Sequence, residues 1–219
     1  MKRQLTMKQK KYIGIKRQLD FMLSLAACIV LSPVFLVLCI AIKSDSRGPI
    51  LFKQKRVGIH KKYFWIYKFR TMRIDTPKDI PTHLLANPEQ YITKMGHFLR
   101  KFSLDELPQL LNILKGDMSF VGPRPALWNQ DDLIAEREKY GANDVLPGLT
   151  GWAQINGRDE LEIPVKARLD GIYVKHISFR FDVRCFLGTF LSVICANGVV
   201  EGGTGEMKKK KSGQRSKLR

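Results

Sequence analysis

An uncharged apolar segment near the amino terminus constrains this chain more than any other feature. Residues 21–42 read FMLSLAACIVLSPVFLVLCIAI, 22 residues without a charged side chain. As a straight helix rising ~1.5 Å per residue, the segment would be about 33 Å long, which is enough to reach across the hydrocarbon core of a bilayer. The sequence therefore predicts that residues 21–43 insert into a membrane.

Two paths through the membrane fit this segment. Ser32-Pro33 lies at its middle, where proline removes a backbone donor and clashes with the preceding turn, so the helix should bend. The Ser32 hydroxyl can bond a carbonyl that the proline leaves free. Seven basic residues lie in residues 1–20 and seven in residues 43–62, so the flanking charge sets no preferred orientation. A kinked spanning helix and a re-entrant hairpin that returns to the same face both agree with these residues.

The charge of the chain limits its partners. Lys and Arg number 38 against 20 Asp and Glu, which gives a net charge of +18. Such an excess indicates nucleic acid, an anionic membrane surface or phosphorylated substrates. Basic residues on both sides of an apolar segment favour anionic lipid, and no known nucleic-acid motif is present. The four cysteines lack a CxxC spacing and sit in apolar runs, which indicates small buried or lipid-facing residues in a reducing, cytoplasmic setting.

The remaining patterns predict an α+β fold in which a small, mostly helical domain carries a basic β-hairpin. We expect a basic amino-terminal segment (1–20), a membrane-inserted helix (21–43), a folded domain (44–200) and a basic disordered tail (201–219). Within the domain, alternation in 50–74 predicts the hairpin, with its turn at 57–62. Apolar spacing predicts helices over residues 93–101, from 103 to 116, and over 127–140, 160–175 and 182–195, whereas 117–160 is otherwise mostly loop. The last helix is amphipathic, so it either packs on the core or lies in the membrane interface.

Two adjacent carboxylates, Asp105 and Glu106, are the strongest candidates for chemistry. Ser103 and Glu106 fit a capping box at the start of a helix, and Asp105 would then favour the helix dipole without any catalytic role. The same arrangement also holds an aspartate beside a second carboxylate, with Arg100 and Lys101 near enough to keep it ionised. An ionised aspartate can attack phosphorus, and a carboxylate pair with substrate phosphates can hold Mg²⁺.

Several basic side chains are candidates for binding phosphate. Lys68, Arg70 and Arg73 lie on or just after the predicted hairpin, which could alternatively be a solvated hairpin resting on lipid. Arg124 lies between two prolines that fix the backbone, which suits bidentate phosphate recognition, although a rigid turn with a surface arginine is equally consistent.

A Gly-rich segment near residue 150 is a candidate nucleotide or sugar loop. Trp152, Gln154 and Asn156 can stack on or hydrogen-bond a base. The tryptophan could equally anchor the core or lie at a membrane interface.

These motifs, in this order, resemble one known family. The chain is similar to bacterial sugar transferases of the monotopic polyprenyl-phosphate phosphoglycosyl transferase type, and to their small single-domain members, from about residue 15 to 200. The matching stretches are KRQLD (16–20), LSP (31–33), FKQKRVG (52–58), YKFRTM (67–72), SLDELPQ (103–109), GDMSFVGPRP (116–125) and PGLTGWAQINGR (147–158).

The resemblance implies a reaction and a set of roles. Such enzymes move a phospho-sugar from a UDP-sugar to undecaprenyl phosphate and release UMP, at the start of capsule, exopolysaccharide or glycan assembly. Asp105 would be the nucleophile that forms a covalent phosphosugar intermediate, and Glu106 would hold Mg²⁺ beside it. Lys68, Arg100 and Arg124 match basic positions expected near the phosphates, and Arg70 of the hairpin is our further candidate for binding phosphate. The candidate nucleotide or sugar loop comprises Thr150, Trp152, Gln154, Asn156 and Arg158.

The resemblance also implies a location and partners. Ser32-Pro33 matches the re-entrant break, which would place a monotopic protein at the cytoplasmic face of the cell membrane. The other partners we expect are a second copy of the chain, in a homodimer, and downstream glycosyltransferases. Two other classes remain as hypotheses from the residues alone. A membrane-anchored scaffold would use its basic surface to bind lipid or an assembly partner. The hypothesis of a nucleic-acid binder is supported by the net positive charge alone.

Overall fold

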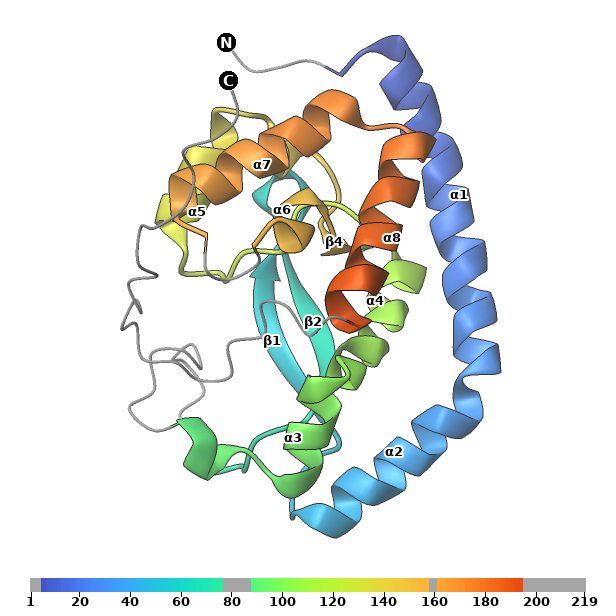
Figure 1. Ribbon diagram of the computed structural model, residues 1–219, viewed down its shortest axis with the longest axis vertical. Coiled ribbons are helices and arrows are strands. Elements are labelled where there is room, and N and C mark those ends of the chain that lie inside the picture. The colour runs from blue at the N-terminus through green and yellow to red at the C-terminus, as the bar shows by residue number, and fades with distance from the viewer. Residues whose placement is uncertain (1–4, 77–87, 158–160, 195–219) are drawn as a thin grey trace, which may run out of the picture.

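The computed structural model describes residues 5–76, 88–157 and 161–194, so Arg158 and the basic tail lie outside the described residues. Helices surround a two-stranded hairpin and a second, shorter strand pair, which confirms the α+β class (Figure 1). The elements are α1 (Met7–Val30), α2 (Ser32–Asp45), β1 (Leu51–Val57), β2 (Tyr63–Phe69), α3 (Lys94–Lys101), α4 (Leu110–Lys115), β3 (Ser119–Val121), α5 (Asp131–Glu138), β4 (Gly148–Thr150), α6 (Trp152–Ile155), α7 (Ile163–His176) and α8 (Phe179–Ile194).

The apolar segment bends where the sequence predicted. Helices α1 and α2 meet at an angle of 62°. The Ser32 hydroxyl donates to the Ile29 carbonyl at 2.8 Å, the carbonyl that the missing N–H of Pro33 would bond in an unbroken helix. Among the described residues, none of the helices can cross a membrane alone by length and composition, whereas the bent pair taken together can.

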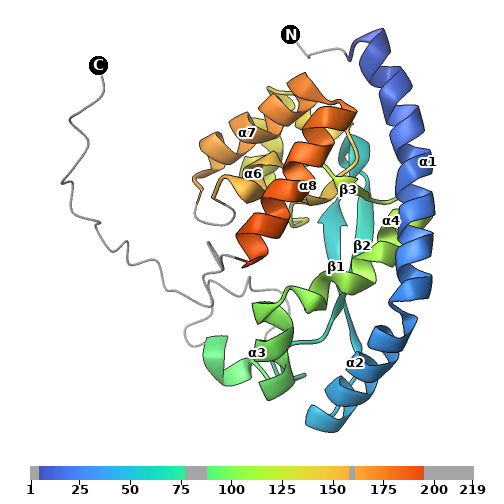
Figure 2. The same cartoon turned by 45° about the vertical axis from the view of Figure 1, so that its right-hand side comes forward.

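Helix α1 is fixed to the domain by its own polar side chains, and it runs without interruption across residue 20. Lys16 lies 2.6 Å from Asp182 of α8, and Arg17 donates to the Ile113 and Leu114 carbonyls at the end of α4 at 2.6 and 3.0 Å. Figure 2 shows α1 lying alongside α4. Part of the basic amino-terminal charge is therefore used inside the protein to hold the apolar segment at a set angle to the domain.

The predicted hairpin is present, and a second strand pair was not predicted. β1 and β2 are antiparallel, in register from Leu51 opposite Phe69 to Val57 opposite Tyr63. β3 and β4 form a parallel pair within residues 117–160, which we expected to be mostly loop apart from a short helix. Strands of three residues are too short to show alternation, and their backbones meet closely, since a Cβ on Gly148 would lie 2.1 Å from the Gly122 nitrogen.

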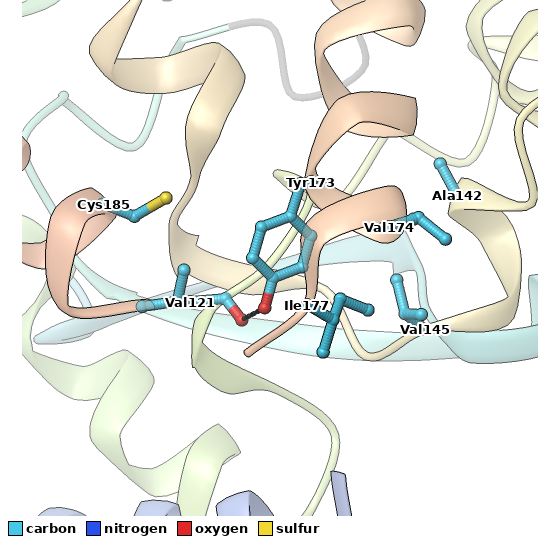
Figure 3. Close-up of a cluster of buried hydrophobic side chains, with 7 residues drawn as sticks. All are labelled: Val121, Ala142, Val145, Tyr173, Val174, Ile177 and Cys185. Carbon is cyan, nitrogen blue, oxygen red and sulfur yellow. Dashed lines mark hydrogen bonds between the residues drawn. The ribbon is translucent and has the colours of Figure 1, made fainter. Parts of the chain in front are cut away.

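A buried tyrosine connects the last two helices to this strand pair. Tyr173 of α7 donates a hydrogen bond to the Val121 carbonyl at 2.9 Å within an apolar cluster (Figure 3). The cluster consists of Val121, Ala142, Val145, Tyr173, Val174, Ile177 and Cys185. Burial raises the pKa of the Cys185 thiol to about 12, in agreement with the predicted role of this cysteine as an inert core residue. The cluster holds β3, and with it the loop that follows, in a fixed position.

Candidate active site

The backbone at the carboxylate pair differs from the predicted helix start. Ser103 has φ 54°, in the left-handed region, and its side chain makes no cap, so the capping box was wrong. Because α3 ends only two residues earlier, the chain must reverse at Ser103 and cannot take the extended conformation of an N-cap. A 3₁₀ helix, Leu104–Gln109, precedes α4 instead. The Glu106 carboxylate is thereby free for other partners.

The fold brings four of the predicted residues together. The Lys68 Nζ of β2 lies 2.7 Å from Glu106 Oε1 and 3.8 Å from Asp105 Oδ2. The Arg124 Nη2, from the loop after β3, lies 2.9 Å from the same Glu106 oxygen. Both carboxylate side chains are only 14% exposed. Two cations and two carboxylates therefore meet in a largely buried cluster.

The two carboxylates are not equivalent. Burial raises the pKa of Asp105, and Glu106 adds to this rise while Lys68 opposes it. Burial acts on Glu106 in the same direction, but Arg124 and Lys68 outweigh it and hold the pKa of Glu106 well below its usual range. Glu106 is thus a fixed anion that positions the two cations, whereas the charge of Asp105 depends on what surrounds it.

The backbone around Arg124 is held by its neighbours. The Gly122 N–H donates to the Thr150 carbonyl at 2.8 Å, and the Gly148 N–H donates to the Pro123 carbonyl at 2.9 Å. Arg56 of β1 donates to the Pro125 carbonyl at 3.0 Å. This residue was missed as a site residue, although strand alternation places it on the same face of the hairpin as Lys68. The arginine therefore approaches the carboxylates from a stiff loop.

The other predicted cations are placed differently. Arg100 donates to the Thr71 hydroxyl at 3.0 Å, and its charge lowers the pKa of Asp105. Arg70 is 6% exposed and donates to carbonyls of Ser46 and Arg47 at the end of α2, at 2.7 and 2.6 Å. Its guanidinium therefore closes the carboxyl-terminal end of the bent helix pair and does not join the carboxylate cluster, contrary to our expectation.

Replacing Arg70 with methionine tests this placement. We expect the free energy of unfolding to fall by about 1–3 kcal/mol, because buried carbonyls at the end of α2 lose their donor. The KM for the UDP-sugar that the family resemblance implies should stay unchanged, because Arg70 does not join the carboxylate cluster. Chemical denaturation and steady-state kinetics measure the two effects, with exposed Arg73, paired to Asp75 at 2.6 Å, replaced by methionine as the control. A raised KM with an unchanged free energy of unfolding would show that Arg70 contacts the substrate after all.

The candidate loop divides into packing residues and cavity residues. The Trp152 ring packs on Phe181 at 4.9 Å between ring centres, and Arg184 lies over it at 5.0 Å, which agrees with a core anchor. Asn156 donates to the Trp152 carbonyl at 2.8 Å. Thr150 and Gln154 instead line a cavity of about 180 Å³ that reaches Glu106. Its wall consists of Ser103, Glu106, Leu107, Leu110, Phe120, Leu149, Thr150, Gln154, Ile155, Phe186 and Thr189.

The carboxylate pair can hold a metal ion only with outside ligands. Across the described ranges, no group of three or more His, Cys, Asp and Glu side chains is placed to bind an ion. Asp105 and Glu106 supply two hard oxygen donors side by side. This donor set fits Mg²⁺, which commonly takes one or two carboxylates and completes its shell with water and substrate phosphates.

Known proteins resemble this chain over most of its length. Residues 11–196 match the model of the bacterial sugar transferase family. The uncharacterized sugar transferase EpsL of Bacillus subtilis is 40% identical over 185 residues, which cover 84% of this chain and 90% of that protein. The exopolysaccharide production protein PSS of Rhizobium leguminosarum is also 40% identical, over 81% of this chain and 94% of its own length.

A relative with a stated reaction is longer than this chain. The UDP-glucose:undecaprenyl-phosphate glucose-1-phosphate transferase of Escherichia coli is 37% identical over 80% of this chain, but the match covers 39% of that protein. Since the family match extends over most of the residues, including the whole carboxylate cluster, the chain belongs to the bacterial sugar transferase family.

Proposed function

We propose that this protein transfers a sugar phosphate from a UDP-sugar to undecaprenyl phosphate and releases UMP. One observation carries the proposal. Glu106 lies between Lys68 and Arg124 at the edge of a cavity of about 180 Å³, and Asp105, next to it in the chain, lies 3.8 Å from the Lys68 ammonium. Relatives named as undecaprenyl-phosphate glucose or galactose phosphotransferases support it. Both substrates carry phosphate, so a positively charged surface favours their capture.

The chemistry follows from the inequivalent carboxylates. The ionised Asp105 oxygen attacks the sugar-bearing phosphorus, forming an O–P bond as the bond to the UMP oxygen breaks. UMP leaves with the electron pair. A phosphate oxygen of the lipid then attacks the same phosphorus and displaces Asp105, so no net proton is required. Lys68 and Arg124 are placed to stabilise the negative charge that develops on the phosphoryl oxygens.

Mg²⁺ is the expected ion. Glu106, together with Asp105, would hold it, and it would supply charge neutralisation for the diphosphate of the donor. Because Glu106 already pairs with Lys68 and Arg124, those cations keep the carboxylate ionised and oriented.

A membrane location agrees with the exposed apolar side chains. Helices α1 and α2 expose many of them to solvent: Phe21, Met22, Leu23, Leu25, Ile29, Val30, Leu36, Val37 and Ile40. Helix α8 exposes Phe179, Val183, Phe186, Leu187 and Leu191. The 62° bend suits a re-entrant hairpin, and an amphipathic α8 suits the interface. In this arrangement the soluble donor and the lipid acceptor would meet at the cytoplasmic surface.

Release of UMP tests the proposed reaction. The full chain in detergent or nanodiscs, supplied with Mg²⁺ and undecaprenyl phosphate, should release UMP from one member of a panel of UDP-sugars. Omitting the lipid should reduce release to a single turnover, because the phosphosugar would remain on Asp105. If no UDP-sugar gives UMP and no phosphosugar becomes attached from a cell extract, the scaffold hypothesis stands instead.

A further inference from the structure

Gln154 is unusual among the side chains that line the cavity beside Glu106. It is 7% exposed, and neither polar atom of its amide has a hydrogen-bond partner within the described ranges. The two threonines of the wall bond each other through their hydroxyls, and Thr189 also donates to the Cys185 carbonyl at 2.8 Å. A buried amide without a hydrogen-bond partner destabilises the folded protein, and a ligand that pairs with the amide would remove this cost.

The wall of the cavity limits what that ligand can be. Most of its side chains are apolar, among them Phe120, Leu149 and Ile155. A sugar ring carries hydroxyls all around it and would leave most of them unpaired against such a wall. An isoprenyl chain would leave the Gln154 amide unpaired instead. A flat ring with apolar faces and one polar edge satisfies both the wall and the amide.

We propose that this cavity binds the uracil ring of the donor, with the Gln154 amide paired to the polar edge of the base. The amide oxygen accepts from the N3–H of uracil, and the amide NH₂ donates to the neighbouring carbonyl oxygen. This proposal rests on the proposed function, since it takes a uridine nucleotide as the ligand. It assigns base recognition to one residue of the candidate loop and leaves Trp152 a packing role.

The fold couples this base site to the phosphate site. A Cβ on Gly151 would lie 2.8 Å from the Gln154 Oε1 and 2.1 Å from the Gly122 carbonyl oxygen, so glycine lets these groups approach closely. Gly122 begins the loop that carries Arg124, and its N–H bonds the Thr150 carbonyl. Gln154, in the helix α6 that follows β4, and Arg124, in the loop that follows β3, are therefore held relative to each other by the pairing of these two strands.

Binding of modified nucleotides tests the proposal. The full chain in detergent micelles would be titrated with UMP, with N3-methyl-UMP, which lacks the N3 donor, and with 5-methyl-UMP, which adds equal bulk away from the polar edge. We expect the wild type to bind UMP and 5-methyl-UMP at least about tenfold more tightly than N3-methyl-UMP. In Gln154→Met, which keeps the side-chain length, this preference should disappear, and the affinity for pyrophosphate should not change.

Gln109 provides a matched control. It is 1% exposed, and its Nε2 also lacks a partner among the described residues, but it does not line the cavity. Gln109→Met should keep the preference for UMP over N3-methyl-UMP. Equal binding of these two nucleotides by the wild type, or an unchanged preference in Gln154→Met, would overturn the proposal even if UMP is released. If Gln154→Met does not fold, two measurements still test the proposal. They are the binding of the three nucleotides to the wild type and the same titrations of Gln154→Asn. If the wild type binds no uridine nucleotide at all, the result contradicts the proposed function itself and not only the role of Gln154.

Discussion

Asp105→Asn is expected to lower the turnover number by at least about 10⁴-fold while leaving the protein folded. Asparagine has the same shape as aspartate but carries no charge, so in the proposed reaction its amide oxygen cannot displace UMP from phosphorus. The assay is UMP release together with labelling of the protein by a UDP-sugar carrying a radioactive sugar. The wild type should become labelled in the absence of lipid, and the variant should not.

Stability separates this result from a folding defect. Burial raises the pKa of Asp105, so ionising this carboxylate makes the folded state less stable than a neutral group would, and the loss grows as the pH rises through the raised pKa. Asp105→Asn should therefore unfold at an equal or higher temperature than the wild type at pH 7. The control is Glu106→Gln, which removes the anion that Lys68 and Arg124 share and should lower stability. Full labelling of Asp105→Asn would exclude Asp105 as the nucleophile.

The sequence predicted the elements whose patterns are local. The bend at Ser32-Pro33, the hairpin with its turn and the helix from Thr93 each depend on residues close together in the chain, and each is present. The capping box failed because the same Ser-x-x-Glu pattern suits either a helix start or a 3₁₀ turn, and only the nearby end of α3 decides between them. A local sequence pattern does not predict how two elements pack against each other.

The candidate site shows the same limit. Lys68 and Arg124 were expected near phosphate, and the fold places both on Glu106. Arg70, only two residues after Lys68, had the same sequence signal but serves the end of α2. Strand alternation does not distinguish the two side chains, because Lys68 and Arg70 are two residues apart and are therefore expected on the same face of the hairpin. What differs is the position of α2, which depends on the contacts of α1 with α4 and α8, far away in the sequence.

Lys68→Met is expected to lower kcat/KM at pH 7 by about 10²-fold and to move its acid limb to higher pH. The Lys68 ammonium opposes the effect of burial on Asp105, so its removal raises the pKa of that carboxyl further. In the proposed reaction the ionised form of Asp105 attacks, so activity should be lost as the pH falls through this pKa, and in the variant the loss should begin at a higher pH. Raising the pH should recover part of the lost rate.

Lys53→Met is the matched control, because it removes the same charge from the same hairpin. Lys53 lies across from Tyr67, with its ammonium 5.6 Å from the centre of that ring, on the face of the hairpin opposite to Lys68. The pH profile of this variant should match that of the wild type. If Lys68→Met lowered the rate equally at every pH, Lys68 would bind phosphate without affecting the charge of Asp105. If the two variants behaved alike, only the total charge of the hairpin would matter, and the pairing of Lys68 with the carboxylates would have no part in catalysis.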